Sequence, residues 1–328
     1  MGALLIAGAC GWGALALWYT VPAAEVVRFL LAATLVALGV GGLIIAVLRR
    51  RVVVPLAPFA AAFAGLLIWW STIEPSNGQD WQADVAVLPS AKVDGHTVTL
   101  RNIRNFRYRT ETDYTPRWYD KTLDLRKLET LDLIAVYWMG DAIAHTMVSF
   151  GFGGGDYIAI SIEIRKRKNQ SFSTIAGFFR QYELTYIVGD ERDLIGLRTN
   201  YRNPPEDVYL YRVSAKRERI RNLFMQYIKQ INQLTRQPEF YNTLTTNCTT
   251  NIVMHVAAIN PDWRLSWKML LSGYFPELIH ERGGLDQSLA FDVLRQKSLI
   301  NERARLAENQ EDFSRYIRDG LLGEQKGK

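Results

Sequence analysis

Three apolar runs open the chain. Leu4–Thr20, Phe29–Leu48 and Val52–Trp70 contain no Asp, Glu, Lys or Arg. Each has about the length of a membrane-spanning helix, ~17–25 residues. The pattern therefore predicts three transmembrane helices within residues 1–72. A signal peptide is the alternative for Met1–Thr20, but this segment lacks the Lys or Arg with which a signal peptide begins.

Shorter alternations of apolar and polar residues follow a polar linker at residues 73–80 and define an extracytoplasmic domain at residues 81–328. Asp94-Gly95 is typical of a hairpin turn. The alternation predicts strands at Asp84–Leu88, His96–Ile103, Leu131–Trp138, Ala144–Phe150, Tyr157–Ile164, Glu183–Val188 and Asp207–Val213. Helical spacing predicts a helix that is capped by Ser214 and runs to about Leu234, and a second helix that begins near Cys248. A third, polar and exposed helix is predicted over Asn301–Arg318, and a polar tail follows at Gly320–Lys328. The expected class is α+β, with a mainly antiparallel sheet.

The charge pattern orients the membrane segment. The chain has 328 residues, 48% of them hydrophobic, and a formal net charge of +6. Arg49, Arg50 and Arg51 separate the second and third apolar runs, and positively charged loops stay in the cytoplasm. The N-terminus is therefore expected in the cytoplasm and the main domain outside it. That location argues against nucleic acid as a partner.

Cys248 is the only cysteine outside the apolar N-terminal segment. Thr245, Thr246 and Asn247 precede it, and all three are favourable N-cap residues, so Cys248 is expected in the first turn of a helix. There the helix dipole and the unpaired backbone N–H groups lower the pKa of a thiol. A lone thiol in an oxidising compartment also indicates reactivity. Cys248 is the candidate nucleophile, with a buried, inert cysteine as the alternative.

A thiolate nucleophile needs a neighbouring base. His96 lies beside a turn, His280 has no apolar pattern to place it inward, and His255 lies about 10 Å along the helix from Cys248 at 1.5 Å per residue. His145 remains as the candidate base. In a hairpin centred on Gly154, Glu163 lies directly opposite His145 and could orient its imidazole.

Other polar residues near this hairpin are candidates for contacts within the site or for structural ion pairs. Ser161 and Ser149 are the fallback partners of His145. A salt bridge from Glu163 to Arg165 or a neighbouring arginine is the structural alternative for that carboxylate. Basic residues near the first hairpin and at 165–168 either are solvated or attract anionic lipid headgroups. Asp190, Glu191 and Asp193 are expected to pair with arginines, because no metal-binding pattern surrounds them. No cofactor or metal is expected.

Several short stretches, taken together, resemble a known family. They are Asn102-Ile103-Arg104-Asn105-Phe106, Ala144-His145-Thr146, Ser149-Phe150-Gly151-Phe152, Ser161-Ile162-Glu163-Ile164-Arg165, Arg180-Gln181-Tyr182-Glu183-Leu184, Asp190-Glu191-Arg192-Asp193-Leu194, Phe240-Tyr241-Asn242 and Thr246-Asn247-Cys248-Thr249. Residues 80–320 thereby resemble the DUF4105 family, the N-terminal periplasmic domain of the Lnb lipoprotein N-acyltransferase. The order of histidine strand, hairpin and Asn-Cys helix also resembles permuted papain-like domains of the NlpC/P60 type.

The resemblance implies an activity and a place in the cell. It implies Cys248 as nucleophile, His145 as base, and transfer of a phospholipid acyl chain through a Cys248 thioester to an amine such as a lipoprotein N-terminus. Glu163 is the third catalytic candidate, and Asn247, Ser149, Ser161 and Arg165 are candidates for substrate contacts. The implied location is the bacterial inner membrane, with the main domain in the periplasm. The alternatives are a cysteine peptidase or amidase acting on cell-wall peptides and a non-enzymatic envelope scaffold.

Overall fold

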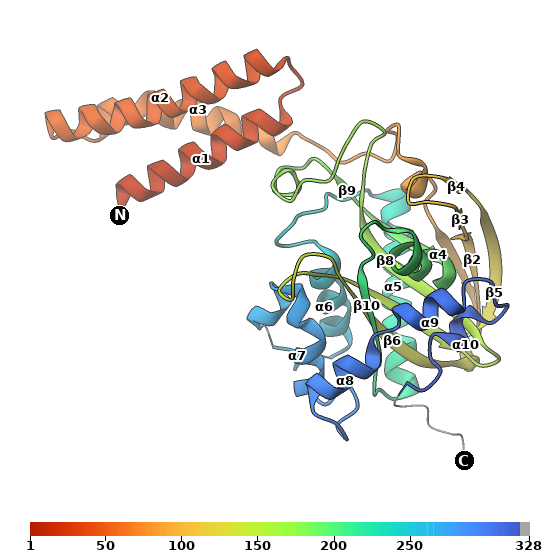
Figure 1. Cartoon of the computed structure of the whole chain (residues 1–328). Helices are drawn as coiled ribbons and strands as arrows, with labels where there is room; N and C mark the ends of the chain where they lie inside the picture. The colour runs from red at the N-terminus through yellow and green to blue at the C-terminus, as the bar shows by residue number, and fades with distance from the viewer. Residues whose placement is uncertain (261, 265, 322–328) are drawn as a thin grey trace. The chain divides into compact units, whose positions relative to one another are not determined.

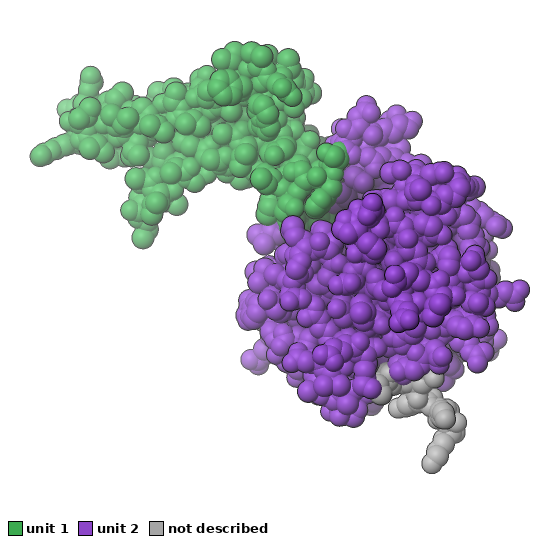
Figure 2. All heavy atoms as spheres, in the orientation of Figure 1, with its two compact units in different colours: residues 1–76, 171–183, 240–243 green, residues 77–170, 184–239, 244–328 purple. Residues whose placement is uncertain are grey.

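A computed structural model of the chain describes residues 1–260, 262–264 and 266–321 (Figure 1). The chain forms two compact units, coloured separately in Figure 2. Unit 1 comprises residues 1–76, 171–183 and 240–243, and unit 2 comprises residues 77–170, 184–239 and 244–328. The first unit thus combines the apolar N-terminal segment with two short segments from much later in the chain. From residue 322 on, the predicted polar tail lies outside the described residues.

Unit 1 contains the three predicted apolar helices, α1 (Gly2–Thr20), α2 (Glu25–Arg49) and α3 (Val53–Ser71) (Figure 1). Each is long and apolar enough to cross a membrane. Small residues allow the helices to approach closely, as is usual where membrane helices cross. A Cβ added at Gly39 of α2 would lie 2.3 Å from the Cys10 sulfur of α1. Most of the apolar surface of these helices faces outward, which suits a lipid environment.

Unit 2 is built around a mixed sheet. Its strands are β1 (Ser90–Asp94), β2 (Thr97–Arg104), β5 (Trp118–Asp124), β6 (Leu128–Tyr137), β7 (Ala144–Phe152), β8 (Asp156–Arg165), β9 (Glu183–Gly189) and β10 (Asp207–Arg212). Among the described residues the sheet order is β1-β2-β9-β8-β7-β6-β10, with β5 paired to β2. The pairs β1–β2, β2–β5, β10–β6, β6–β7 and β7–β8 are antiparallel, and β2–β9 is parallel. The short strands β3 (Arg107–Tyr108) and β4 (Tyr114–Thr115) form a separate ribbon. The predicted α+β class with a mainly antiparallel sheet is confirmed.

Helices cover both faces of this sheet (Figure 1). Helix α5 (Arg217–Arg236) packs Phe224 against Phe150 and Phe152 of β7, with ring centroids 5.0 and 5.7 Å apart. On the other face, Ile134 and Met147 belong to a core cluster with residues from the C-terminal helices. The remaining helices are α4 (Glu191–Gly196), α6 (Cys248–Ile259), α7 (Phe275–Glu281), α8 (Phe291–Ser298), α9 (Asn301–Leu306) and α10 (Phe313–Tyr316).

One predicted strand and the start of one predicted helix were wrong. The strand expected at Asp84–Leu88 is instead a single 3₁₀ turn at Ala83–Val85, and the first hairpin strand is β1. This turn packs Val85 into the core, which accounts for its apolar residues without a strand. The helix expected with Ser214 as its N-cap begins at Arg217, and Lys216 is the N-cap residue. The Ser214 N–H instead donates to the Gly284 carbonyl.

The C-terminal region also differs from its prediction. The exposed helix expected over Asn301–Arg318 is two short helices, α9 and α10, which bury Ala304, Phe313 and Ile317 in the core of unit 2. Arg318 is buried as well and pairs with Asp132 of β6 and Glu191 of α4. The charge of this region is thus neutralised by partners that are distant in sequence, which a local pattern does not reveal.

Candidate active site

Cys248 is the first residue of α6, as predicted. The Asn247 side chain accepts a hydrogen bond from the Thr250 N–H at 2.9 Å, and the Asn247 N–H donates to the Thr250 hydroxyl at 2.8 Å. This reciprocal pair is a capping box, which fixes the start of a helix. The Cys248 side chain is half-buried. The thiol therefore sits at the positive end of a helix dipole.

The β7–β8 hairpin has the predicted register. Met147 pairs with Ser161 and Ser149 with Ala159, so the turn is centred on Gly154. The same register places Glu163 across from His145. Directly opposite residues share a face of the sheet, and the His145 Nε2 lies 3.1 Å from Glu163 Oε1.

Ser161 lies between these two side chains. Its Oγ is 2.7 Å from His145 Nε2, and its hydroxyl donates to Glu163 Oε1 at 2.6 Å. A hydroxyl has one proton to donate. Because that proton goes to Glu163, the serine oxygen can only accept from His145. The imidazole therefore carries its proton on Nε2, which leaves Nδ1 for the thiol.

The Cys248 thiol and the His145 imidazole lie close enough for each to shift the pKa of the other. Burial raises the pKa of the Cys248 thiol, but the neighbouring imidazole outweighs it, and the pKa falls from 9.0 to about 7. Burial lowers the pKa of His145, but Glu163 and the thiolate outweigh it, and the pKa rises from 6.5 to about 9. Between these values the pair is a thiolate and an imidazolium, the reactive form of a cysteine nucleophile.

Two threonines join the elements that carry the pair. Thr146 follows His145 on β7 and Thr249 follows Cys248 on α6, and their hydroxyl oxygens lie 3.0 Å apart. Both residues are fully buried. Hydrogen bonds from the Thr146 backbone and side chain also lower the pKa of the thiol. Neither threonine was predicted as a site residue, although each directly follows a candidate catalytic residue in the sequence.

Arg198, which follows α4, is a further site residue that was not predicted from the sequence. It donates to Glu163 Oε1 at 2.9 Å and to the Leu194 carbonyl at 2.9 Å, and its side chain is 8% exposed. Burial raises the pKa of Glu163, but His145 and Arg198 outweigh it and hold the pKa well below its usual range. The carboxylate therefore remains charged beside His145. Glu163 does pair with an arginine, but the partner is Arg198 from outside the hairpin and not Arg165 or its neighbours, as the structural alternative predicted.

Two of the candidate substrate contacts are buried in the fold. Ser149 is fully buried on β7. Arg165 donates to the Val85 carbonyl at 2.9 Å, the Ala86 carbonyl at 2.8 Å and Asn77 Oδ1 at 2.8 Å, and it stacks on the Trp81 ring. These contacts tie the end of β8 to the segment that enters unit 2. Arg165 thus has a structural role, and a role for it or Ser149 in substrate binding stays a prediction.

The other histidines lie where the sequence predicted them. His96 is exposed in the first hairpin turn. His255 is buried in α6, with its Nε2 2.7 Å from the Tyr186 hydroxyl, and burial lowers its pKa to about 4. His255 is therefore a neutral core residue rather than a second base. His280 Nε2 lies 3.0 Å from the Leu289 carbonyl.

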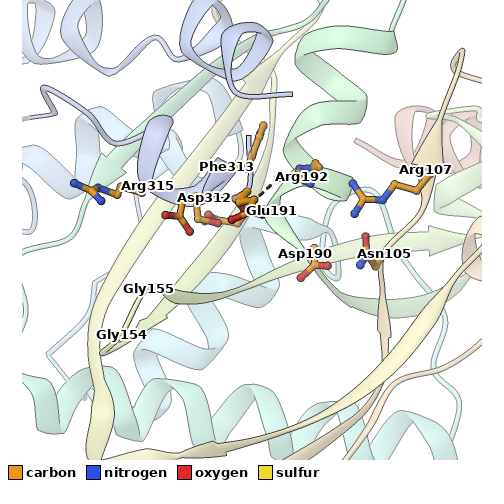
Figure 3. Close-up of a pocket in the computed structure, with 12 residues that line it drawn as sticks. Asn105, Arg107, Gly154, Gly155, Asp190, Glu191, Arg192, Asp312, Phe313 and Arg315 are labelled. Atoms are coloured by element: carbon orange, nitrogen blue, oxygen red, sulfur yellow. Dashed lines mark hydrogen bonds between the residues drawn. The ribbon is translucent and has the colours of Figure 1, made fainter. Parts of the chain in front are cut away.

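A groove of unit 2 is lined by other residues than this site. It has a volume of about 530 Å³ and brings together residues of mixed charge, among them Arg107, Asp190, Arg192 and Asp312, around the Gly154-Gly155 turn (Figure 3). Neither Cys248 nor His145 lines it. Because neither candidate catalytic residue lines this groove, we assign it no part in the thiol chemistry.

The acidic residues of the 190–193 segment pair mainly as predicted. Asp193 accepts from Arg104 Nη2 at 2.7 Å and Nε at 3.1 Å, and Glu191 pairs with Arg318. Asp190 instead accepts from the Tyr119 hydroxyl at 2.6 Å. Within the described ranges no group of three or more His, Cys, Asp or Glu residues is arranged to hold a metal ion.

Residues 114–274 match a family model described as the Lnb N-terminal periplasmic domain. The matched range contains His145, Glu163, Arg198 and Cys248. No curated protein and no solved structure gave a match.

Proposed function

We propose, from the match of residues 114–274 to the Lnb N-terminal periplasmic domain, that the protein is a membrane-anchored thiol acyltransferase. In this proposal Cys248 takes an acyl chain from a phospholipid as a thioester and passes it to an amine, such as the N-terminus of a lipoprotein. The thiol chemistry of this proposal is supported by the lowered pKa of Cys248 beside a His145 imidazole that Glu163 orients. The choice of a lipid as acyl donor is supported by the three apolar helices.

The proposed reaction has two balanced steps. The Cys248 thiolate attacks the ester carbonyl, a C–S bond forms, the ester C–O bond breaks, and the leaving alcohol takes a proton from the His145 imidazolium. The acceptor amine then attacks the thioester while His145 accepts its proton, and the amide forms as the C–S bond breaks. In this proposal the Cys248 N–H, at the start of α6, helps to stabilise the oxyanion in both steps.

The membrane segment supports a lipid as the acyl donor. Helices α1, α2 and α3 enclose an apolar groove of about 430 Å³, lined by residues such as Leu17, Leu35, Leu66 and Trp69. Such a surface suits an acyl chain. Arg49, Arg50 and Arg51 favour a cytoplasmic N-terminus in the bacterial inner membrane, and a periplasmic domain would then follow α3 directly.

Two alternatives predict different chemistry at the same residues. A cell-wall peptidase or amidase of the NlpC/P60 type, with its permuted papain-like fold, would use the same thiol and imidazole but pass the acyl group to water. A scaffold without activity would not need the thiol and imidazole in contact, and their contact counts against it. Because the dyad fits both enzymes, the membrane anchor is the feature that favours acyl transfer.

The test is intact mass spectrometry of the purified chain incubated with bacterial phospholipid. Wild type is expected to gain a fatty-acyl mass that hydroxylamine removes, and Cys248→Ala is expected to gain none. His145→Ala should slow the gain, with His96→Ala as its control because His96 is exposed in the first hairpin turn. If lipid gives no adduct and the protein cleaves cell-wall peptides, the acyl-transfer proposal is wrong and the protein is a hydrolase.

A further inference from the structure

Residues 171–183 form a loop within unit 1, together with the membrane helices and residues 240–243 (Figure 2). Phe179 of this loop is 4% exposed. Its ring stacks on Tyr19 with centroids 5.6 Å apart, and its centroid lies 6.2 Å from that of Trp70 and 6.4 Å from that of Trp12. The loop is therefore packed against α1 and the end of α3.

These contacts place the loop at a defined depth along the helices. Helix α1 ends at Thr20, and Trp12 lies eight residues earlier, which is ~12 Å along the axis at 1.5 Å per residue. Phe179 touches both Trp12 and Tyr19, so it lies beside the last two turns of α1. Tyr19 and Trp70 are aromatic residues of the kind that mark a membrane–water boundary. Phe179 therefore lies at the level of that boundary.

Arg180 ties the loop to the end of α3. Its guanidinium donates to the Trp70 carbonyl at 2.7 Å and to the Ile73 carbonyl at 3.0 Å, and it lies over the Trp70 ring at 5.0 Å. The last carbonyls of a helix lack partners within the helix, and a cation there is favourable. The Trp70 carbonyl also accepts from the Ile73 N–H, so the arginine adds a charged partner at the C-terminal end of α3.

Residues 240–243 hold the loop from the other side. The Thr243 hydroxyl donates to the Thr174 carbonyl at 2.8 Å, and the Thr243 N–H donates to the Gly177 carbonyl at 3.3 Å. A Cβ at Gly177 would lie 2.3 Å from the Thr243 hydroxyl oxygen, so the close approach depends on glycine. Thr243 precedes the nucleophile Cys248 by five residues in the sequence.

The anchored loop exposes three large apolar side chains. Phe172 is 55% exposed, Ile175 51% and Phe178 38%. Exposed apolar residues grouped on one segment indicate contact with a partner or a membrane. Continuity with the boundary aromatic residues of α1 and α3 selects the membrane. We infer that Phe172, Ile175 and Phe178 insert into the outer leaflet of the bilayer that α1–α3 cross, at the level of the headgroups.

The inference concerns where the loop lies and does not depend on acyl transfer. It is tested with the full chain in vesicles of phosphatidylethanolamine and phosphatidylglycerol. Ile175→Cys is labelled with an environment-sensitive fluorophore in a background of Cys10→Ala and Cys248→Ser. The matched control is Leu306→Cys on α9, an apolar residue that is 72% exposed. Lipids carrying a nitroxide near the headgroup or near the chain end serve as quenchers.

The expected result is blue-shifted emission at position 175 and several-fold stronger quenching by the headgroup-proximal nitroxide than at position 306. Equal, water-like emission at both positions would overturn the inference. If the nitroxide at the end of the acyl chain quenches position 175 more strongly than the nitroxide near the headgroup, the loop does not lie at the level of the headgroups. Labels at Phe172→Cys and Phe178→Cys repeat the measurement independently, because each position is exposed and its substitution leaves the core intact.

Discussion

The His145 Nε2 lies 3.1 Å from Glu163 Oε1 across the β7–β8 hairpin, and Ser161 bridges the two groups. This arrangement engages Nε2 and leaves the other ring nitrogen, Nδ1, for interaction with Cys248. Arg198 contacts the same carboxylate oxygen from outside the hairpin. Glu163 therefore stays ionised and can stabilise the imidazolium, which in turn stabilises the thiolate. We therefore expect the reactivity of Cys248 to depend on this chain of contacts.

The rate of Cys248 alkylation by iodoacetamide should rise with pH through a midpoint of about 7. Glu163→Gln removes the negative charge that raises the pKa of His145, so less imidazolium faces the thiol. The midpoint should then move upward, toward the ordinary thiol value. Glu129→Gln is the control, because Glu129 pairs with Arg217 at the surface. An unchanged midpoint in Glu163→Gln would show that Glu163 does not influence the pKa of the Cys248 thiol.

The rate of thioester formation should have a bell-shaped dependence on pH, with an acidic limb and a basic limb. Below about 7 the thiol is protonated and no longer a nucleophile, and above about 9 the imidazole has lost the proton that the leaving alcohol needs. The rate should therefore be highest between these values. Initial rates of acyl-adduct formation across the range, by mass spectrometry, would measure both limbs. A rate that keeps rising beyond the upper limb would exclude His145 as the acid.

Asn247→Ala should destabilise the start of α6. The cap contributes about 1 kcal/mol in comparable helices, and its loss lets the first turn, which carries Cys248, fray. Alkylation of the thiol near its midpoint should then slow, while Asn247→Ser, which retains a capping oxygen, should restore it. Thermal unfolding in detergent and the alkylation rate would be measured for both variants. Equal rates in the alanine and serine variants would contradict a role for the cap.

Asp193→Asn should destabilise unit 2 strongly. The fully buried carboxylate accepts hydrogen bonds from the Arg104 guanidinium, the Phe106 N–H and the Tyr108 hydroxyl. Breaking a buried pair leaves an uncompensated charge and costs about 3–5 kcal/mol. Asp113→Asn is the control, because its ion pair with Arg109 is exposed and solvent-screened. The measurement is denaturant unfolding in detergent, and similar midpoints for both variants would contradict the prediction.

Local features of the sequence were sufficient for three parts of this protein. The apolar runs predicted α1–α3, because a span of the bilayer needs only length and the absence of charge. The polar residues before Cys248 predicted the start of α6, because a capping box closes within four residues. The glycine-rich turn predicted the register that brings Glu163 to His145, because a hairpin is fixed by its own turn.

Only the tertiary structure decided which distant groups complete the site. The arginine beside Glu163 is Arg198 rather than a neighbour in the strand, and Thr146 meets Thr249 across 103 residues. Residues 171–183 join the membrane helices because Phe179 and Arg180 find their partners there. Each of these contacts joins two segments whose own sequence patterns give no sign of the partner. Such partners are chosen by packing and by the cost of leaving a buried charge unpaired, which act only once the chain is folded.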